Sequence, residues 1–139
     1  MIVLDTNVLS ESFKPTPSAT VMRWLGATEP SSIFTTTVTQ AEILYGVESM
    51  PAGKRRSCLQ EAVEAIFEID FRDRILSFDE EAARCYARIV VARESIGRQI
   101  SQFDAQIAAI CRARNATLAT RNIADFEKCG IALVNPWNA

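Results

Sequence analysis

Side chains that could bind a metal ion recur just after short apolar segments of this sequence. The carboxylates are Asp5, Glu42, Asp104 and Asp125, and Asn122 adds an amide oxygen. Oxygen ligands of this kind suit hard divalent cations such as Mg²⁺ or Mn²⁺, which also retain water and bind substrate phosphate. Such an ion activates water and stabilises the attacking and leaving oxygens of a phosphodiester, so these residues could support hydrolysis of that bond.

The composition narrows the chemistry further. The sequence contains no histidine, which removes Ser-His-Asp and Cys-His nucleophile systems and most acid–base catalysis by imidazole. The four cysteines are widely separated and form no CxxC pair, so we expect free thiols in a reducing compartment rather than disulfides or a zinc site. An enzyme built from this chain must work with carboxylates, hydroxyls, amines or a metal.

Strand-like and helix-like segments alternate along the chain. Short apolar or β-branched runs predict strands at 2–4, 33–36, 74–78, 116–120 and 131–134. Helical spacing predicts helices at 7–12, 18–25, 38–50, 59–69, from 79 onward and at 101–114. The helix at 59–69, with Leu59, Val63, Ile66 and Ile69 on one face, and the helix that begins at Asp79 are candidates to pack as a pair. This alternation predicts an α/β three-layer sandwich, with a central parallel sheet of four to five strands flanked by helices.

The predicted sheet brings the oxygen ligands together. Asp5 follows the first strand, Glu42 lies in the first turns of the helix after the second, and Asp104 lies in the first turn of the central helix. Asn122 and Asp125 follow the fourth strand. The carboxyl ends of parallel strands form one edge, where ligands bind in such sheets. Carboxylates converging there without cationic partners would raise one another's pKa, a cost that a divalent cation would remove.

Each acid also has a structural explanation of its own. Thr39-x-x-Glu42 and Ser101-x-x-Asp104 match the capping box, and acids in a first helical turn interact favourably with the helix dipole. Asp5 and Asp125 could be N-caps. Thr6 and Thr120 could hydrogen-bond a carboxylate or a catalytic water, or cap the backbone. Only the joint pattern favours a metal site.

The net charge and the hydropathy of the chain indicate which partners it binds and in which cellular compartment it lies. The net charge is −2, so bulk charge does not indicate a protein that binds polyanions. No segment has the roughly 18 uninterrupted apolar residues of a membrane span, and the N-terminus lacks a signal-peptide pattern. We therefore expect a cytoplasmic protein with no membrane association. The absence of repeats or Gly/Ser linkers predicts one domain over residues 1–139.

Five motifs follow one another along the chain. They are Asp-Thr-Asn at 5–7 after an apolar strand, Thr37-x-x-x-x-Glu42, "DAQIAAI" from Asp104, "LATRNIADF" from Leu118 and "LVNPW" at 133–137. In this order they resemble PIN-domain ribonucleases. The resemblance covers residues 2–137 and is closest to the toxins of VapBC-type toxin–antitoxin modules, especially the FitB-like branch. Haloacid-dehalogenase-like phosphatases are a poorer match, because their second aspartate is replaced here by Asn7.

The resemblance implies a PIN-like fold and a Mg²⁺- or Mn²⁺-dependent endoribonuclease that leaves a 5′-phosphate and a 3′-hydroxyl. It also implies a homodimer, silenced by a cognate antitoxin that inserts a segment into the active-site groove, in a larger assembly. Carried over by position, Asp5, Glu42 and Asp104 are the core metal ligands. Many members have an aspartate where this chain has Asn122, so either Asn122 or Asp125 completes the site.

RNA binding needs cationic side chains, because carboxylates repel phosphate. Candidates are Lys54, Arg55, Arg56, Arg98 and Arg121. A basic groove built across a dimer is an equal alternative. The alternative function is a non-catalytic PIN-fold module that binds RNA or protein, since the amide of Asn122 contributes no charge to a metal site.

Overall fold

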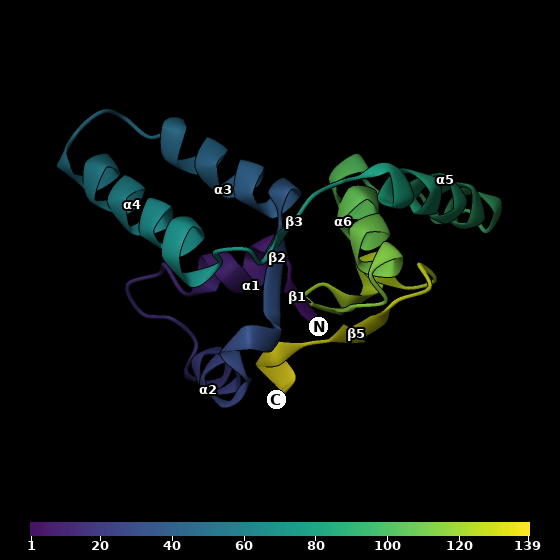
Figure 1. Cartoon of the computed structure of the whole chain (residues 1–139), viewed down its shortest axis with the longest axis horizontal. Helices are drawn as coiled ribbons and strands as arrows, with labels where there is room; N and C mark the ends of the chain where they lie inside the picture. Colours follow the sequence, from purple (N-terminus) through teal and green to yellow (C-terminus); the bar gives the residue numbers. More distant parts are fainter.

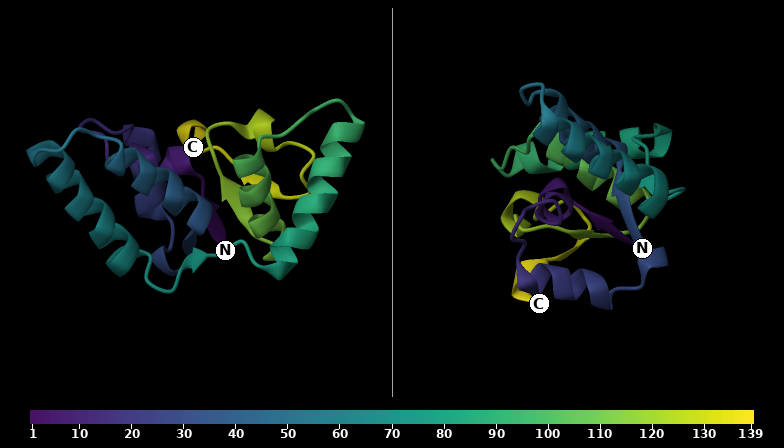
Figure 2. Two further views of the ribbon diagram at one scale, coloured as in Figure 1. Left: turned by 90° about the horizontal axis from the view of Figure 1, so that it is seen from above. Right: turned by 90° about the vertical axis from the view of Figure 1, so that its left-hand side faces the viewer.

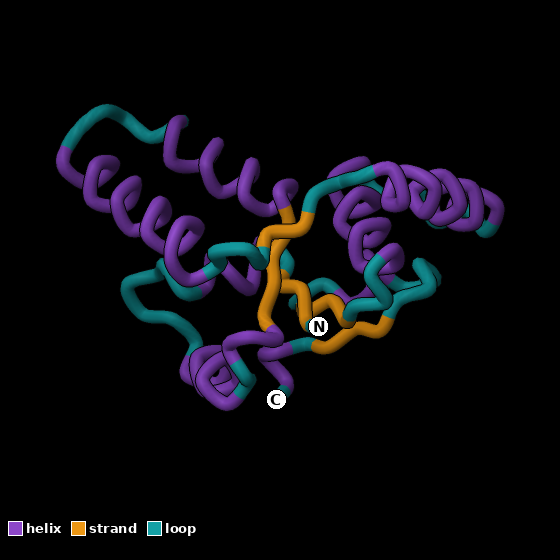
Figure 3. The backbone as a smooth tube through the Cα atoms, in the orientation of Figure 1, coloured by secondary structure: helices purple, strands orange, loops and turns teal.

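A five-stranded parallel sheet runs through the middle of the computed structural model, which describes residues 1–139 (Figures 1 and 3). Its strands are β1 (Ile2–Leu4), β2 (Ile33–Thr36), β3 (Ile75–Leu76), β4 (Thr117–Ala119) and β5 (Ala132–Val134), in the spatial order β3-β2-β1-β4-β5. From β1 the chain runs outward through β2 to the edge strand β3 on one side, and through β4 to the edge strand β5 on the other. The switch point between β1 and β4 is where ligands bind in open parallel sheets.

Six α-helices flank the sheet. They are α1 (Thr6–Glu11), α2 (Ala19–Ala27), α3 (Thr37–Glu48), α4 (Lys54–Ala65), α5 (Glu80–Ser95) and α6 (Gln102–Ala113). Short helical turns follow α4 (η2, Ile66–Asp70), β4 (η3, Ile123–Phe126) and β5 (η4, Pro136–Asn138). The predicted α/β sandwich with a central parallel sheet is therefore confirmed, with five strands. None of these helices is long and apolar enough to cross a membrane.

Alternating side chains of the sheet contribute to two separate cores. Val3 and Leu118 belong to the core that includes α5 and α6, where the apolar helix α6 supplies an unbroken buried run from Ile107 to Cys111. Leu4 and Ala119 belong to the core formed with α1, α2, α3 and α4. Consecutive residues of a strand point to opposite faces, so β1 and β4 serve both cores. These two central strands are thereby fixed in place beneath the predicted site.

The helix pairing differs from the prediction. Helix α5 packs along α6, and α4 packs beside α3; Figure 2 shows the two pairs on opposite sides of the molecule. The connections explain the difference. Residues 49–53, with Pro51 and Gly53, join α3 to α4 as a helical hairpin, whereas the chain between α4 and α5 passes through β3 at the sheet edge. Helices α4 and α5 are both amphipathic, but they do not pack against each other.

The apolar face predicted for residues 59–69 is wrong at its end. Ile69 is 71% exposed, whereas Phe67 and Phe71 are 5% and 6% exposed. Residues 66–70 form a π-helical turn, in which the Phe71 N–H donates to the Ile66 carbonyl at 2.9 Å. One extra residue per turn shifts the helical phase, so Phe67 and Phe71 face the core in place of Ile69.

Candidate active site

The Asp5 carboxylate lies at the switch point between β1 and β4 and is 5% exposed. Asp5 is the N-cap of α1, and its Oδ1 accepts a 2.8 Å hydrogen bond from the Thr6 backbone N–H. Its Oδ2 accepts from the Thr120 hydroxyl at 2.8 Å and from the Asn7 amide at 3.4 Å. Asp5 is therefore held by neutral donors on both sides of the switch point, with no cationic side chain in contact.

Glu42 lies in the second turn of α3, and its carboxylate accepts from the Thr6 hydroxyl at 3.1 Å. The predicted capping box is wrong here. Thr36, not Thr39, is the N-cap, because the Thr36 hydroxyl accepts from the Thr39 N–H at 3.1 Å. Thr39 lies inside the helix, so capping does not explain a carboxylate at position 42.

Asp104 lies in the first turn of α6 and is half-buried. Its backbone N–H donates to the hydroxyl of Ser101, the predicted N-cap, at 3.2 Å. A hydrogen bond from the Ser101 side chain also opposes the rise that burial causes in the pKa of the Asp104 carboxyl, and Asp104 lines the cleft described next.

A cleft of about 280 Å³ joins these residues at the carboxyl edge of the sheet. All of its lining side chains are polar or charged: Asp5, Thr6, Asn7, Glu42, Asp104 and Asn122. Asn122 is exposed and its N–H donates to the Thr120 hydroxyl at 3.1 Å. Asp125 is also exposed, in η3, and does not line the cleft. The fold therefore brings Asn122 to the three predicted core ligands, with Asp125 close by.

The carboxylates of the cleft disfavour one another's ionisation. Burial, with smaller contributions from the charges of Asp104 and Glu42, raises the pKa of Asp5 to about 6, although the Thr120 and Thr6 hydrogen bonds oppose this. Burial and the Asp104 charge raise the pKa of Glu42. Burial and the Asp125 charge raise the pKa of Asp104. The cleft thus concentrates negative charge that a cation would neutralise.

The donor chemistry fits a hard divalent cation, because the cleft offers carboxylate, hydroxyl and amide oxygens and no thiolate or imidazole. No three acidic or cysteine side chains are close enough together to surround one ion. Side-chain movement is therefore required before Asp5, Glu42 and Asp104 could share a cation.

Asn7 is a residue of the cleft to which the sequence assigned no role. Its amide nitrogen lies 3.4 Å from both Asp5 Oδ2 and the Thr120 hydroxyl, and its amide oxygen accepts from the Arg121 N–H at 3.2 Å. Asn7 thus links the segments that follow β1 and β4. Its place in the Asp-Thr-Asn triplet at a strand–helix junction was the available signal.

The predicted phosphate-binding residues lie apart from one another. Lys54, Arg55 and Arg56 begin α4, at the end of the α3–α4 hairpin far from the sheet (Figure 1), and Arg56 pairs with Glu48 at 2.8 Å. Arg98 pairs with Glu127 at 3.3 Å. Among these candidates, Arg121 directly follows Thr120 beside the cleft, and its guanidinium lies 4.9 Å from the centre of the Trp137 ring.

Comparison with known proteins identifies the class. The PIN domain family model matches residues 2–130. The plasmid stability protein StbB of Pseudomonas syringae pv. tomato is 39% identical over 139 residues, which cover both chains completely. The VapC ribonuclease Y4jK of Sinorhizobium fredii is 38% identical, covering 99% of this chain and 98% of its own. The toxin FitB of Neisseria gonorrhoeae is 36% identical, covering 99% of each chain.

Solved structures agree with the sequence comparison. The structure of FitAcB from Neisseria gonorrhoeae superposes with a TM-score of 0.95 at 36% identity, over the whole of both chains. VapBC-5 from Mycobacterium tuberculosis, described as a member of the VapBC family of toxin–antitoxin systems, has a TM-score of 0.71 at 26% identity and 96% coverage of both chains.

This chain belongs to the PIN domain family. Its similarity to VapC-type toxins, FitB among them, confirms the resemblance drawn from the five motifs.

Proposed function

We propose that this protein is a metal-dependent endoribonuclease toxin that hydrolyses RNA phosphodiester bonds and is neutralised by a cognate antitoxin. The observation that supports this most strongly is the convergence of Asp5, Glu42 and Asp104 on one polar cleft. The chain is also 38% identical, over 99% of its length, to a protein named a VapC ribonuclease. A homodimer within a cytoplasmic toxin–antitoxin assembly completes the proposal.

Asp5, Glu42 and Asp104 would hold Mg²⁺ or Mn²⁺, with Asn122 or Asp125 as a further ligand. Once bound, the cation supplies charge neutralisation at the scissile phosphate and lowers the pKa of a water. Asp5 provides the fixed point, because Thr120, Asn7 and the Thr6 backbone already hold its carboxylate. The Thr6 hydroxyl orients Glu42. Glu42 and Asp104 must move toward Asp5, since no three acids surround an ion in this arrangement.

The contact with RNA is proposed for residues near the cleft rather than for the start of α4. Arg121 is the candidate whose backbone N–H donates to the cleft residue Asn7. A cationic side chain there would offset the repulsion between phosphate and the acidic cleft. Lys54 and Arg55 lie at the end of the α3–α4 hairpin that is far from the sheet (Figure 1). They could therefore contact only an RNA long enough to extend from the cleft past the end of α3.

The toxin proposal is tested by induced expression in bacteria. We expect the wild-type chain to arrest growth and to fragment cellular RNA, and Asp104→Asn to abolish both effects at equal protein level. Asp73→Asn is the matched control: Asp73 is exposed at a φ of 62°, a backbone conformation that asparagine adopts readily. Arrest by Asp104→Asn equal to that by the wild type would contradict the proposal.

Two observations favour a second function. Asn122 places a neutral amide in the cleft, and the carboxylates do not surround an ion. A non-catalytic module that binds RNA or protein would bind RNA equally well in EDTA and after Asp104→Asn, and would not cleave it.

A further inference from the structure

Arg93 is the one basic residue with a buried side chain. It lies in the last turn of α5, is 4% exposed and forms an ion pair with no carboxylate. A buried cation is costly unless hydrogen bonds and nearby negative charge compensate it. The side chain therefore needs an explanation beyond helix packing.

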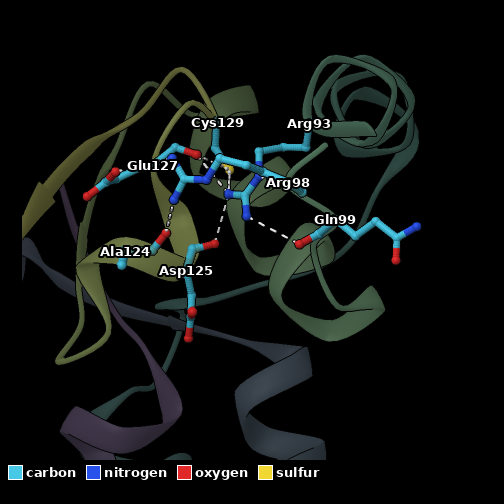
Figure 4. A network of polar contacts seen from close by, with 7 residues as sticks. All are labelled: Arg93, Arg98, Gln99, Ala124, Asp125, Glu127 and Cys129. Atoms are coloured by element: carbon cyan, nitrogen blue, oxygen red, sulfur yellow. Dashed lines mark hydrogen bonds and ion pairs between the residues drawn. The ribbon is translucent and has the colours of Figure 1, made fainter. Parts of the chain in front are cut away.

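Backbone carbonyls from two separate segments surround the Arg93 guanidinium (Figure 4). Nε donates to the Arg98 carbonyl at 2.7 Å, and one terminal nitrogen donates to the Gln99 carbonyl at 3.4 Å. The other terminal nitrogen donates to the carbonyls of Asp125 at 3.0 Å and Glu127 at 2.7 Å, and lies 3.7 Å from the Cys129 sulfur. The planar guanidinium thus joins the α5–α6 connection to the segment that contains η3.

Both of these segments lead to the acidic cleft. The α5–α6 connection ends at Ser101, the N-cap of α6, three residues before Asp104. The second segment carries the exposed residues Asn122, the N-cap of η3, and Asp125, which lies in η3. Arg98 adds an outer link, because its guanidinium donates to the Ala124 carbonyl at 3.0 Å. Arg93 therefore joins the segment that leads to Asp104 and the segment that carries Asn122 and Asp125. Phe126 of η3 also packs in the core that contains α6.

We propose that Arg93 is a positioning residue of the active site: its buried guanidinium holds the 121–129 segment against the start of α6 and so sets the spacing between Asp104 and the Asn122–Asp125 turn. The part of this proposal that concerns cation binding depends on the proposed function. The part that concerns the 121–129 segment does not.

The test compares Arg93→Met and Arg93→Lys with the control Arg84→Met. Arg84 lies on the same helix and forms only exposed pairs with Glu80 and Glu81. Two properties of the folded proteins are measured without RNA: amide hydrogen exchange of residues 121–129 in EDTA, and Mn²⁺ affinity by electron paramagnetic resonance. We expect faster exchange in both Arg93 variants, because a lysine nitrogen cannot bridge the two segments as the planar fork does.

Mn²⁺ affinity should fall by about tenfold or more in Arg93→Met, in the range found for residues that orient metal ligands. Arg93→Lys should lie between Arg93→Met and the wild type, since it retains the charge, and Arg84→Met should match the wild type in both measurements. If Arg93→Met does not fold, Arg93→Lys decides the outcome.

Wild-type exchange of residues 121–129 in a folded Arg93 variant would overturn the proposal. So would unchanged Mn²⁺ affinity, provided that the wild type binds Mn²⁺. A wild type that binds no Mn²⁺ would instead contradict the proposed function, and hydrogen exchange alone would then decide whether Arg93 positions the segment.

Discussion

Asp5 combines burial with hydrogen bonds from uncharged donors. Its carboxylate is nearly inaccessible, and the charges of Glu42 and Asp104 add to the cost of ionising it. A cation at the cleft would relieve this cost, so the same residue should weaken the fold in EDTA and stabilise it when metal is bound. If the cleft binds a metal ion as proposed, the ionisation of Asp5 links the stability of the fold to that binding.

The raised pKa of Asp5 predicts a definite pH dependence. The carboxyl has a pKa of about 6 in the folded protein against 3.8 for the isolated group, so the folded state retains the proton more strongly. The Asp5 contribution to the unfolding free energy is fully present below about pH 4 and is lost as pH rises through 6, a change of about 3 kcal/mol. The measurement is urea unfolding in EDTA between these pH values.

The control for that experiment is Asp5→Asn, which cannot titrate at this position. The difference in unfolding free energy between wild type and variant should shift in favour of the wild type as pH falls. A difference that is constant with pH would contradict the raised pKa.

Thr120 should matter for both stability and activity. Its buried hydroxyl donates to Asp5 and accepts from the Asn122 N–H. Thr120→Val keeps the shape of the side chain but leaves both groups without this partner, so we expect a loss of about 1–3 kcal/mol in unfolding free energy and slower RNA cleavage. Thr117→Val is the control, because Thr117 begins β4, the strand that ends just before Thr120. Equal stability and activity for the two variants would show that the Thr120 hydroxyl does not hold Asp5.

At the level of elements, periodicity predicted the strands because each is a short apolar or β-branched run. It predicted the acids at one edge because parallel strands end together. Periodicity failed where the backbone departs from regular helical geometry. No sequence pattern in residues 59–69 indicates the π turn that exposes Ile69. The capping box predicted at Thr39 is wrong because threonines at 36, 37 and 39 can all cap a helix. Which of them is the N-cap depends on where the helix begins, and the sequence does not fix that residue.

The π turn makes a testable prediction about packing. Phe67→Ala should lower the unfolding free energy by about 3–5 kcal/mol, as truncation of a buried aromatic does, while Ile69→Ala should change it by less than about 0.5 kcal/mol, as expected for an exposed site. Chemical denaturation of both variants measures this. A larger loss of unfolding free energy in Ile69→Ala than in Phe67→Ala would indicate that Ile69 is buried as in a regular helix, and would contradict the π turn.

At the scale of the whole molecule, the site is assembled from segments that are far apart in the chain. Asp5, Glu42 and Asp104 could be predicted because each acid has a local position relative to a strand or helix. The Asp-Thr-Asn triplet was a signal for Asn7, although its contact with Thr120 appears only in the fold. Arg93 could not be predicted, because its partners are backbone groups of distant segments that meet only in the fold. The partnership of α5 with α6 was also unpredictable, since amphipathic patterns do not specify which helix covers which.

A cation bound across these segments should stabilise the folded molecule as a whole. At a free Mn²⁺ concentration one hundred times the dissociation constant, the gain is about 2.7 kcal/mol. We expect the melting temperature of the wild type to rise with Mn²⁺, and that of Asp104→Asn to rise much less. Calorimetry with matched EDTA samples measures this, and an equal rise in both proteins would place the bound ion away from the cleft.

The most direct test of the metal-dependent nuclease is RNA cleavage by the purified wild type, Asp104→Asn and Asp73→Asn, each in Mg²⁺ or Mn²⁺ and in EDTA. We predict cleavage by the wild type and Asp73→Asn in metal only, with 5′-phosphate ends, and none by Asp104→Asn. Cleavage that persists in EDTA or in Asp104→Asn, or folded wild type that binds RNA without cutting it in metal, would contradict the assignment of the carboxylate cleft as a metal-dependent active site.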